Sequence, residues 1–214
     1  MPYKGLYLIG LTGGIACGKS TVLAMLAERG AQVIDADRVT HELQRPGEVV
    51  YEQIVAAFGA GVLVEPGGSI DRRRLGAIVF SDPAALRRLE QLVHPAVHAW
   101  IMSWLDSAAH ASRGAHGPQH APPRVAVIDA VKLLEAGWKG MCDAVWVVTC
   151  DTEQQVRRLV TTRGMSEEEA HTRITAQPPQ ESRAAQADVV IDNSGTLEQT
   201  QAQVEVAWDA IPRI

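Results

Sequence analysis

The sequence predicts an α/β fold in which helices cover a five-stranded parallel sheet. Five short apolar runs indicate the strands, at residues 6–11, 32–35, 124–129, 144–148 and 189–192. These runs are continuously apolar rather than alternating, which is typical of parallel strands buried on both faces. Helical patterns lie between the later strands, and this alternation is the rhythm of βαβ units.

Length and composition favour one globular domain over residues 1–214. Apolar residues make up 46% and charged residues 21%, and the formal net charge is −5 with a pI near 5.8. The acidic balance argues against bulk binding to nucleic acid or to anionic membranes. No apolar run approaches the ~20 residues of a membrane span. The N-terminus has no signal-peptide cleavage site, so we expect a cytoplasmic protein.

A phosphate-binding motif follows the first predicted strand. Residues 13–20 fit the pattern G-x-x-x-x-G-K-[ST], and a helix is predicted from Ser20 to Arg29. Glycines let successive backbone N–H groups turn toward phosphate oxygens, and the helix N-terminus adds partial positive charge. Lys19 is expected to reach the outer phosphates and Ser20 to bind Mg²⁺. The predicted ATP-binding residues of this segment are Gly13, Gly14, Ile15, Ala16, Cys17, Gly18, Lys19, Ser20 and Thr21.

The three cysteines, Cys17, Cys142 and Cys150, match no zinc or redox spacing and are interpreted as reduced thiols. Cys17 lies inside the glycine-rich loop near a helix N-terminus, where the pKa of a thiol is lowered. The alternative is that Cys17 is only a tolerated small residue.

Other motifs narrow the class of nucleotide-binding protein. The sequence contains no N-K-x-D or T-K-x-D guanine reader and no L-S-G-G-Q signature. Asp192–Gly195 fits D-x-x-G, but it comes far too late in the chain for the switch of a small GTPase. The remaining class is mainly small-molecule phosphotransfer.

Two carboxylates, Asp35 and Asp37, follow the second predicted strand. A carboxylate at the carboxyl end of a parallel strand faces the ligand crevice, where it can accept a hydroxyl proton. We therefore interpret Asp37 as a catalytic residue. The alternative is that Asp37 only caps a helix.

A helical region is expected over about residues 38–105, followed by a flexible surface loop over about 107–123. The loop is rich in Ala, His, Gly and Pro and has no periodicity. Its three histidines, His110, His116 and His120, could bind a metal ion. A solvated loop is favoured because no carboxylate or cysteine joins them.

A lid is predicted over about residues 158–178. Arg157, Arg158 and Arg163 share one predicted helix, Gly164 ends it, and Ser166–Glu169 fits a capping box that opens another helix. Two helices with exposed arginines suit a segment that closes over ATP. A plain helical hairpin with solvated arginines fits the same composition.

Taken together, the motifs resemble the dephospho-coenzyme A kinase family over nearly the whole chain. The matching stretches are Ile9–Ile15, Lys19–Thr21, Val33–Asp37, the D-R-x-x-L-G-x-I-V-F stretch at 71–80, His94–Pro95, Gln177, Ala187–Asp188 and Val190–Gly195. The phosphate loop alone is shared by many families, whereas the combination is specific.

The resemblance implies ATP-dependent phosphorylation of the ribose 3′-hydroxyl of dephospho-CoA, the last step of coenzyme A synthesis. It implies a P-loop kinase core with a helical substrate region and a lid. ATP and dephospho-CoA would be the partners, with Mg²⁺ as cofactor and no nucleic acid, membrane or obligate protein partner. By resemblance, Asp37 is the base, Arg158 a phosphate-contacting and ATP-binding residue, and Lys19 the third catalytic residue. The implied substrate contacts are Thr12, Asp37, Arg72 and His94. The expected metal ligands are Ser20 and Asp129, with Asp37 as the alternative to Asp129.

One segment departs from the usual bacterial pattern D-x-P-L-L-F-E. The chain has Asp129–Trp138 here, without the proline and phenylalanine and with Lys132 added. This segment is more similar to the kinase domain of animal bifunctional CoA synthase.

Without the resemblance, the residues leave three alternatives open: a kinase for another small molecule, an NTPase without an acceptor, and a nucleotide-binding module without activity.

Overall fold

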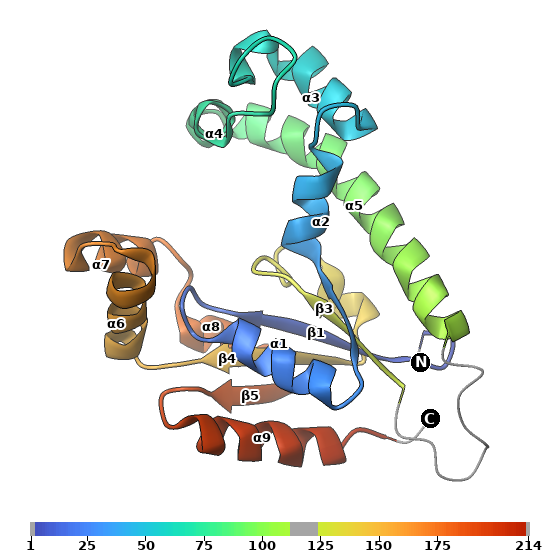
Figure 1. The fold of residues 1–214 in the computed structure, drawn as a ribbon, viewed down its shortest axis with the longest axis vertical. Helices are drawn as coiled ribbons and strands as arrows, with labels where there is room; N and C mark the ends of the chain where they lie inside the picture. Colours follow the sequence, from blue (N-terminus) through green and yellow to red (C-terminus); the bar gives the residue numbers. More distant parts are fainter. Residues whose placement is uncertain (1–2, 112–123, 213–214) are drawn as a thin grey trace. The chain divides into compact units, whose positions relative to one another are not determined.

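The computed structural model of this chain describes residues 3–111 and 124–212 (Figure 1). These residues form two compact units. One holds the described residues up to Ile34 and from Ser107 onward, and the other is Asp35–Asp106. The first unit contains the predicted phosphate-binding loop, and the second matches the predicted helical region.

The sheet has the five strands that the sequence predicts. They are β1 (Tyr7–Gly13), β2 (Gln32–Asp35), β3 (Val125–Asp129), β4 (Ala144–Thr149) and β5 (Val189–Asp192). Their order across the sheet is β2-β3-β1-β4-β5, and β1 pairs in parallel with both β3 and β4. Because the strands are parallel, their carboxyl ends meet at one edge, where ligands bind in α/β folds.

One face of β1 belongs to the main hydrophobic core of the sheet unit. Ile9 and Leu11 are fully buried there, together with side chains from α1 (Lys19–Glu28) and α9 (Leu197–Asp209). These two helices pack against each other. The core therefore fixes the start of α1 relative to the end of β1, and the loop between them spans a constrained gap.

The other face of β1 is covered by the segment that follows β3. A Cβ atom at Gly10 would lie only 2.9 Å from the Leu133 methyl groups and 2.8 Å from the Cys142 sulfur. Glycine at this position thus lets the segment pack directly on the strand. The segment ends in the short helix η2 (Trp138–Met141), whose Trp138 is buried.

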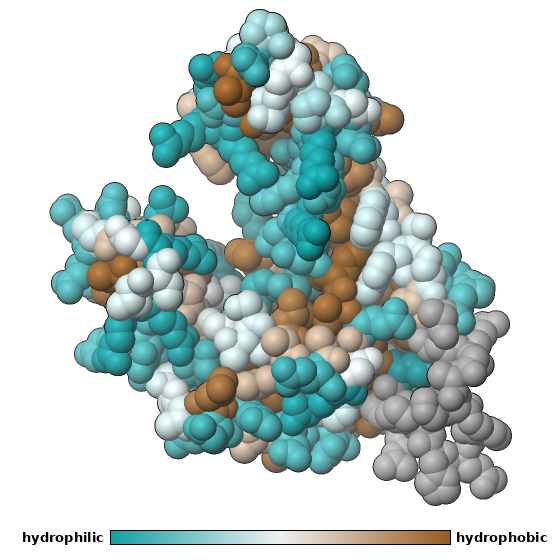
Figure 2. All heavy atoms as spheres, in the orientation of Figure 1, coloured by the Kyte–Doolittle hydropathy of each residue, from teal (hydrophilic) through white to brown (hydrophobic). Residues whose placement is uncertain are grey.

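Two helices, α6 (Thr152–Arg163) and α7 (Glu167–Thr175), occupy the region predicted as a lid. Gly164 ends α6 in the left-handed conformation at φ 63°, and Ser166 and Glu169 form the capping box that opens α7. Figure 2 shows a mainly hydrophilic surface over these helices. A short helix α8 (Gln180–Ala184) follows. The sequence-based helix break and capping box are confirmed.

The second unit is helical, as predicted. It contains α2 (Ala36–Leu43), α3 (Val49–Phe58), η1 (Ala60–Val62), α4 (Arg72–Ser81) and most of α5 (Pro83–Ala111). The cap of α2 is Asp35, whose carboxylate accepts the backbone N–H of Arg38 at 2.9 Å. The alternative in which Asp37 caps this helix is therefore wrong, because β2 ends at Asp35 and Asp37 lies one residue inside the first turn.

The loop predicted over residues 107–123 is wrong at its first residues. Helix α5 continues to Ala111, so residues 107–111 are helical, including His110. Ala108 and Ala109 are buried, and alanine is the strongest helix former, which favours helix over loop in this stretch. His116 and His120 lie outside the described residues. Across 3–111 and 124–212, no three His, Cys, Asp or Glu side chains gather as a metal site would require.

Among the described helices, none combines the length and the apolar character needed to cross a membrane.

Candidate active site

The predicted phosphate-binding loop connects the end of β1 to the start of α1. Gly13 ends the strand, and a Cβ atom there would come within 2.6 Å of the Val148 carbonyl oxygen, so the position requires glycine. Gly18 precedes α1 with φ 87°, and no side chain caps the helix. The N-terminal amides of α1 thus have no capping side chain, which is the arrangement that binds an anion.

Side chains from distant parts of the chain bind three consecutive carbonyl groups of the loop. Gln155 Nε2 donates to the Ile15 carbonyl at 2.7 Å, and an Arg158 guanidinium N–H donates to that of Ala16 at 3.1 Å. Asn193 Nδ2 donates to the Cys17 carbonyl at 2.7 Å. Each of these three side chains therefore holds one carbonyl group of the loop.

A fourth contact is made to an N–H group of the loop. The Ile15 N–H donates to Gln177 Oε1 at 2.9 Å. Gln177 lies just after α7, so the region predicted as a lid contacts the loop from both of its ends. The sequence does not predict the contacts of Gln155 and Asn193 with the loop, because no local pattern places residues so far apart in the chain next to each other.

Lys19 forms an ion pair with Asp129, the last residue of β3. Only 18% of the lysine side chain and 6% of the aspartate side chain are exposed. Asp129 is aligned with Leu11 in the β1–β3 register, which places its carboxylate at the carboxyl edge of the sheet. The structure thus brings together two residues that the sequence predicted for the same site.

Arg158 lies beside the loop, but its partners are backbone groups. Besides the Ala16 carbonyl, its guanidinium donates to the Asn193 carbonyl at 2.9 Å. In this structure Arg158 therefore ties α6 to the loop and to the end of β5. Its predicted contact with phosphate stays a prediction.

The thiol of Cys17 is fully buried within the loop. A hydrogen bond with the Cys150 thiol lowers the pKa of Cys17, although burial acts in the opposite direction. The same hydrogen bond, together with burial, raises the pKa of Cys150. The sequence predicted the direction for Cys17 correctly, but the largest cause is the neighbouring thiol rather than the helix N-terminus.

The two predicted metal ligands, Ser20 and Asp129, offer a hydroxyl and a carboxylate oxygen. Ser20 lies exposed in the first turn of α1, and Asp129 ends a neighbouring strand of the sheet. Hard oxygen donors of this kind suit Mg²⁺, which takes its other ligands from water and substrate phosphates. The residues therefore fit the implied ion.

The four predicted substrate contacts fall into different surroundings. Asp37 lies in the first turn of α2 and is half-buried, Arg72 begins α4 and is exposed, and His94 is exposed on α5. All three belong to the helical unit. Thr12 belongs to the sheet unit, is 1% exposed, and donates to the Val131 carbonyl at 3.1 Å. The substrate contacts stay predictions, and Thr12 has a structural role in joining β1 to the segment after β3.

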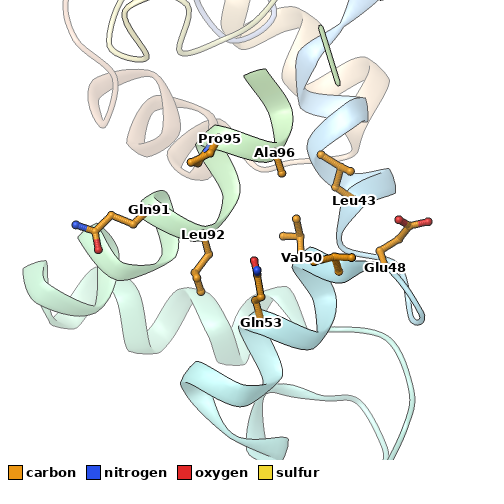
Figure 3. Close-up of a pocket in the computed structure, with 9 residues that line it drawn as sticks. Leu43, Glu48, Val50, Gln53, Gln91, Leu92, Pro95 and Ala96 are labelled. Atoms are coloured by element: carbon orange, nitrogen blue, oxygen red, sulfur yellow. The ribbon is translucent and has the colours of Figure 1, made fainter. Parts of the chain in front are cut away.

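A pocket of about 400 Å³ lies within the helical unit. Figure 3 shows Leu92, Val50 and Gln53 pointing into the space between α5 and α3. Pro95 also lines the pocket, and it has no N–H to donate to the carbonyl of Gln91 one turn earlier. The pocket thus combines apolar walls with polar groups. The lining residues are Leu43, Glu48, Val49, Val50, Gln53, Gln91, Leu92, Pro95 and Ala96.

Two kinases of known structure share this fold. Dephospho-CoA kinase from Campylobacter jejuni aligns with a TM-score of 0.66 at 24% identity, covering 95% of this chain and 96% of that one. Shikimate kinase from Bacteroides thetaiotaomicron aligns with a TM-score of 0.50 at 16% identity, covering 94% and 96%. The sheet, the loop and the helix that follows it therefore define a P-loop kinase fold, as predicted.

The chain belongs to the dephospho-CoA kinase family. The family model described as CoaE, dephospho-CoA kinase, matches residues 7–199. The dephospho-CoA kinase of Symbiobacterium thermophilum is 50% identical, covering 95% of this chain and 80% of the relative. That of Geobacter sulfurreducens is 47% identical, covering 94% and 96%. The crystal structure of TT1252 from Thermus thermophilus aligns with a TM-score of 0.77 at 33% identity, covering 97% and 99%.

These relatives confirm the family resemblance that the motifs indicated. They do not show the similarity of the 129–138 segment to animal CoA synthase, which stays a prediction.

Replacing Lys19 by Ala is expected to have two separable effects. It removes a phosphate-facing charge, so ATP should no longer raise the free energy of unfolding. It also leaves the buried Asp129 carboxylate without its cation, which should cost about 3 kcal/mol of stability. Urea unfolding with and without ATP measures both effects.

The double variant Lys19→Ala/Asp129→Asn is the control, because it also removes the carboxylate charge that Lys19 neutralises. It should recover most of the stability but not the response to ATP. A Lys19→Ala protein that keeps both its stability and its response to ATP would mean that Lys19 has been assigned wrongly.

Proposed function

We propose that this chain transfers the terminal phosphoryl group of ATP to the ribose 3′-hydroxyl of dephospho-CoA, which yields coenzyme A in the last step of its synthesis. The observation that carries this proposal is the family match over residues 7–199, within which the phosphate-binding loop is intact. Relatives of 47–50% identity that cover almost the whole chain carry the same activity in their names.

The reaction needs charge stabilisation and positioning more than covalent chemistry. The loop amides and the Lys19 ammonium group bind the ATP phosphates, and Asp129 orients Lys19 in the absence of nucleotide. Ser20 and Asp129 would hold Mg²⁺, which would neutralise charge on the phosphates. Asp37 accepts the proton of the ribose hydroxyl, and Arg158 offsets charge on the transferred group. The segment 158–178 excludes water, which would otherwise compete as the acceptor.

We further propose that the chain works in the cytoplasm on these two small substrates, without an obligate protein partner or nucleic acid. Its net charge of −5 and its three free cysteines support this setting.

An ADP-release assay with a panel of acceptors tests the activity against its alternatives. Release should require dephospho-CoA and should not occur with adenosine, AMP or other nucleosides. Equal release without any acceptor would identify an NTPase, and preference for another acceptor would identify a different kinase. ATP binding without turnover in any mixture would identify a nucleotide-binding module.

The Asp37→Asn variant tests the base. Asparagine keeps the size of the side chain but cannot accept a proton, so turnover should fall by roughly 10² to 10⁴. Asp37 lies in the first turn of α2, where loss of its charge should cost less than about 1 kcal/mol of stability. The measurement is 3′-phosphorylation of dephospho-CoA at saturating ATP.

Asp35→Asn is the matched control, because Asp35 caps α2 through its side chain and Asn caps as well. Its turnover should stay near that of the unmodified chain. If Asp35→Asn loses turnover and Asp37→Asn keeps it, the wrong carboxylate has been assigned.

We also propose that the pocket between α3 and α5 takes part of the pantetheine arm of dephospho-CoA, because its apolar walls and polar groups suit an alkyl chain with amides. Gln53 is exposed yet lines the pocket, so Gln53→Trp should fill the space without disturbing the core. The KM for dephospho-CoA should rise about tenfold, the effect of losing roughly 1.4 kcal/mol of binding, while the KM for ATP stays unchanged.

Glu52→Trp is the control on the same helix, since Glu52 is exposed and lies outside the pocket lining. Equal KM values for dephospho-CoA in the two variants would mean that the pantetheine arm does not bind in this pocket.

A further inference from the structure

We propose that Asn193 is a positioning residue for the nucleotide phosphates, because it fixes the orientation of the Cys17–Gly18 peptide group. The proposal rests on the proposed function in one respect, namely that the loop binds nucleotide phosphates. Asn193 is not part of the phosphate-binding motif and lies directly after β5.

The peptide group between Cys17 and Gly18 is planar. In a trans peptide the carbonyl of one residue and the N–H of the next point in opposite directions. A side chain that binds the Cys17 carbonyl therefore also aims the Gly18 N–H, on the other side of the loop. Asn193 makes this contact at 2.7 Å, and Gln155 makes the equivalent contact two residues earlier, at the Ile15 carbonyl.

The backbone at this point has freedom that must be restricted. Gly18 has φ 87° and Ala16 has φ 58°, both in the left-handed region. Glycine reaches both halves of the conformational map at little cost, so nothing in Gly18 itself prevents the preceding peptide from rotating. The hydrogen bond from Asn193 supplies the missing restriction. A Cβ atom at position 18 would overlap the Asn193 amide, which shows how closely the two residues pack.

The Asn193 side chain is itself held in one orientation. It is 6% exposed, and its Oδ1 accepts the Thr200 hydroxyl at 2.8 Å. Its backbone N–H donates to the Thr149 carbonyl at 2.8 Å, and its carbonyl accepts from Arg158 at 2.9 Å. Because both ends of the amide have partners, the Nδ2 group stays aimed at the loop.

This arrangement explains why an amide is needed rather than a carboxylate. One end of the side chain must accept from Thr200 and the other must donate to Cys17. Aspartate has the same shape and keeps the first contact, but its second oxygen would face the Cys17 carbonyl with no proton between them. Only the protonated acid would restore the donor.

The test uses Asn193→Asp, with the dissociation constant of ADP measured by calorimetry at pH 8.5 and pH 6. At pH 8.5 the variant should bind ADP roughly 10- to 30-fold more weakly than the unmodified chain, the loss expected when a buried acceptor loses its donor. The ratio should shrink several-fold at pH 6, because burial and the facing Cys17 carbonyl raise the pKa of the new carboxyl more than the neighbouring Arg158 guanidinium lowers it, and the added proton then replaces the amide donor. The KM for dephospho-CoA should not change.

Val204→Ala is the control for a purely structural effect. Val204 is fully buried on α9 in the core of the sheet unit, and its side chain has no polar group that could hydrogen-bond to the loop. This variant should lose thermal stability and still bind ADP within twofold of the unmodified chain at both values of pH.

Three results would overturn the proposal. One is unchanged ADP affinity in Asn193→Asp, and another is a weakening that Val204→Ala reproduces at equal loss of stability. The third is an Asn193→Asp ratio that is independent of pH. If the unmodified chain does not bind ADP, both the proposed function and the proposal for Asn193 are overturned.

Discussion

When a loop presents its N–H groups to an anion, its carbonyl groups point away from the anion. They need hydrogen-bond donors of their own, because buried peptide groups without partners are costly. This constraint governs the segment between Gly13 and Lys19. The strand and the helix on either side satisfy their own backbone groups. Within the loop the Cys17 N–H reaches the Gly14 carbonyl at 3.2 Å, but the next three carbonyl groups take their donors from side chains. Gln155, Arg158 and Asn193 supply three donors to three successive carbonyl groups. The rest of the sheet unit can be understood as the scaffold that brings these donors to one place.

Two elements of the scaffold carry the donors. Helix α6 follows β4 and carries Gln155 and Arg158, and the end of β5 carries Asn193. Since β4 lies between β1 and β5 in the sheet, the strand order brings both elements to the carboxyl edge where the loop begins. On the other side of β1, Asp129 at the end of β3 holds Lys19. Lys19 is therefore held from the β3 side of β1, and the carbonyl groups of the loop are held from the β4 side.

Much of this could be predicted from sequence where the signal is local. The buried strands, the glycine-rich loop, the helix end at Gly164 and the capping box at Ser166 all depend on residues close together in the chain. The contacts of Gln155 and Asn193 with the loop could not be predicted, because they arise only when the sheet assembles. The cap of α2 was missed for another reason. Asp35 and Asp37 are chemically equivalent, and only the observed end of β2 decides between them.

The most direct test of this account is a pair of crystal structures, one without nucleotide and one with ADP bound. The carbonyl groups of Ile15, Ala16 and Cys17 should keep their side-chain partners in both, so that the loop has the same backbone before and after binding. A Cys17–Gly18 peptide that turns over when ADP binds, with loss of the Asn193 hydrogen bond, would contradict it.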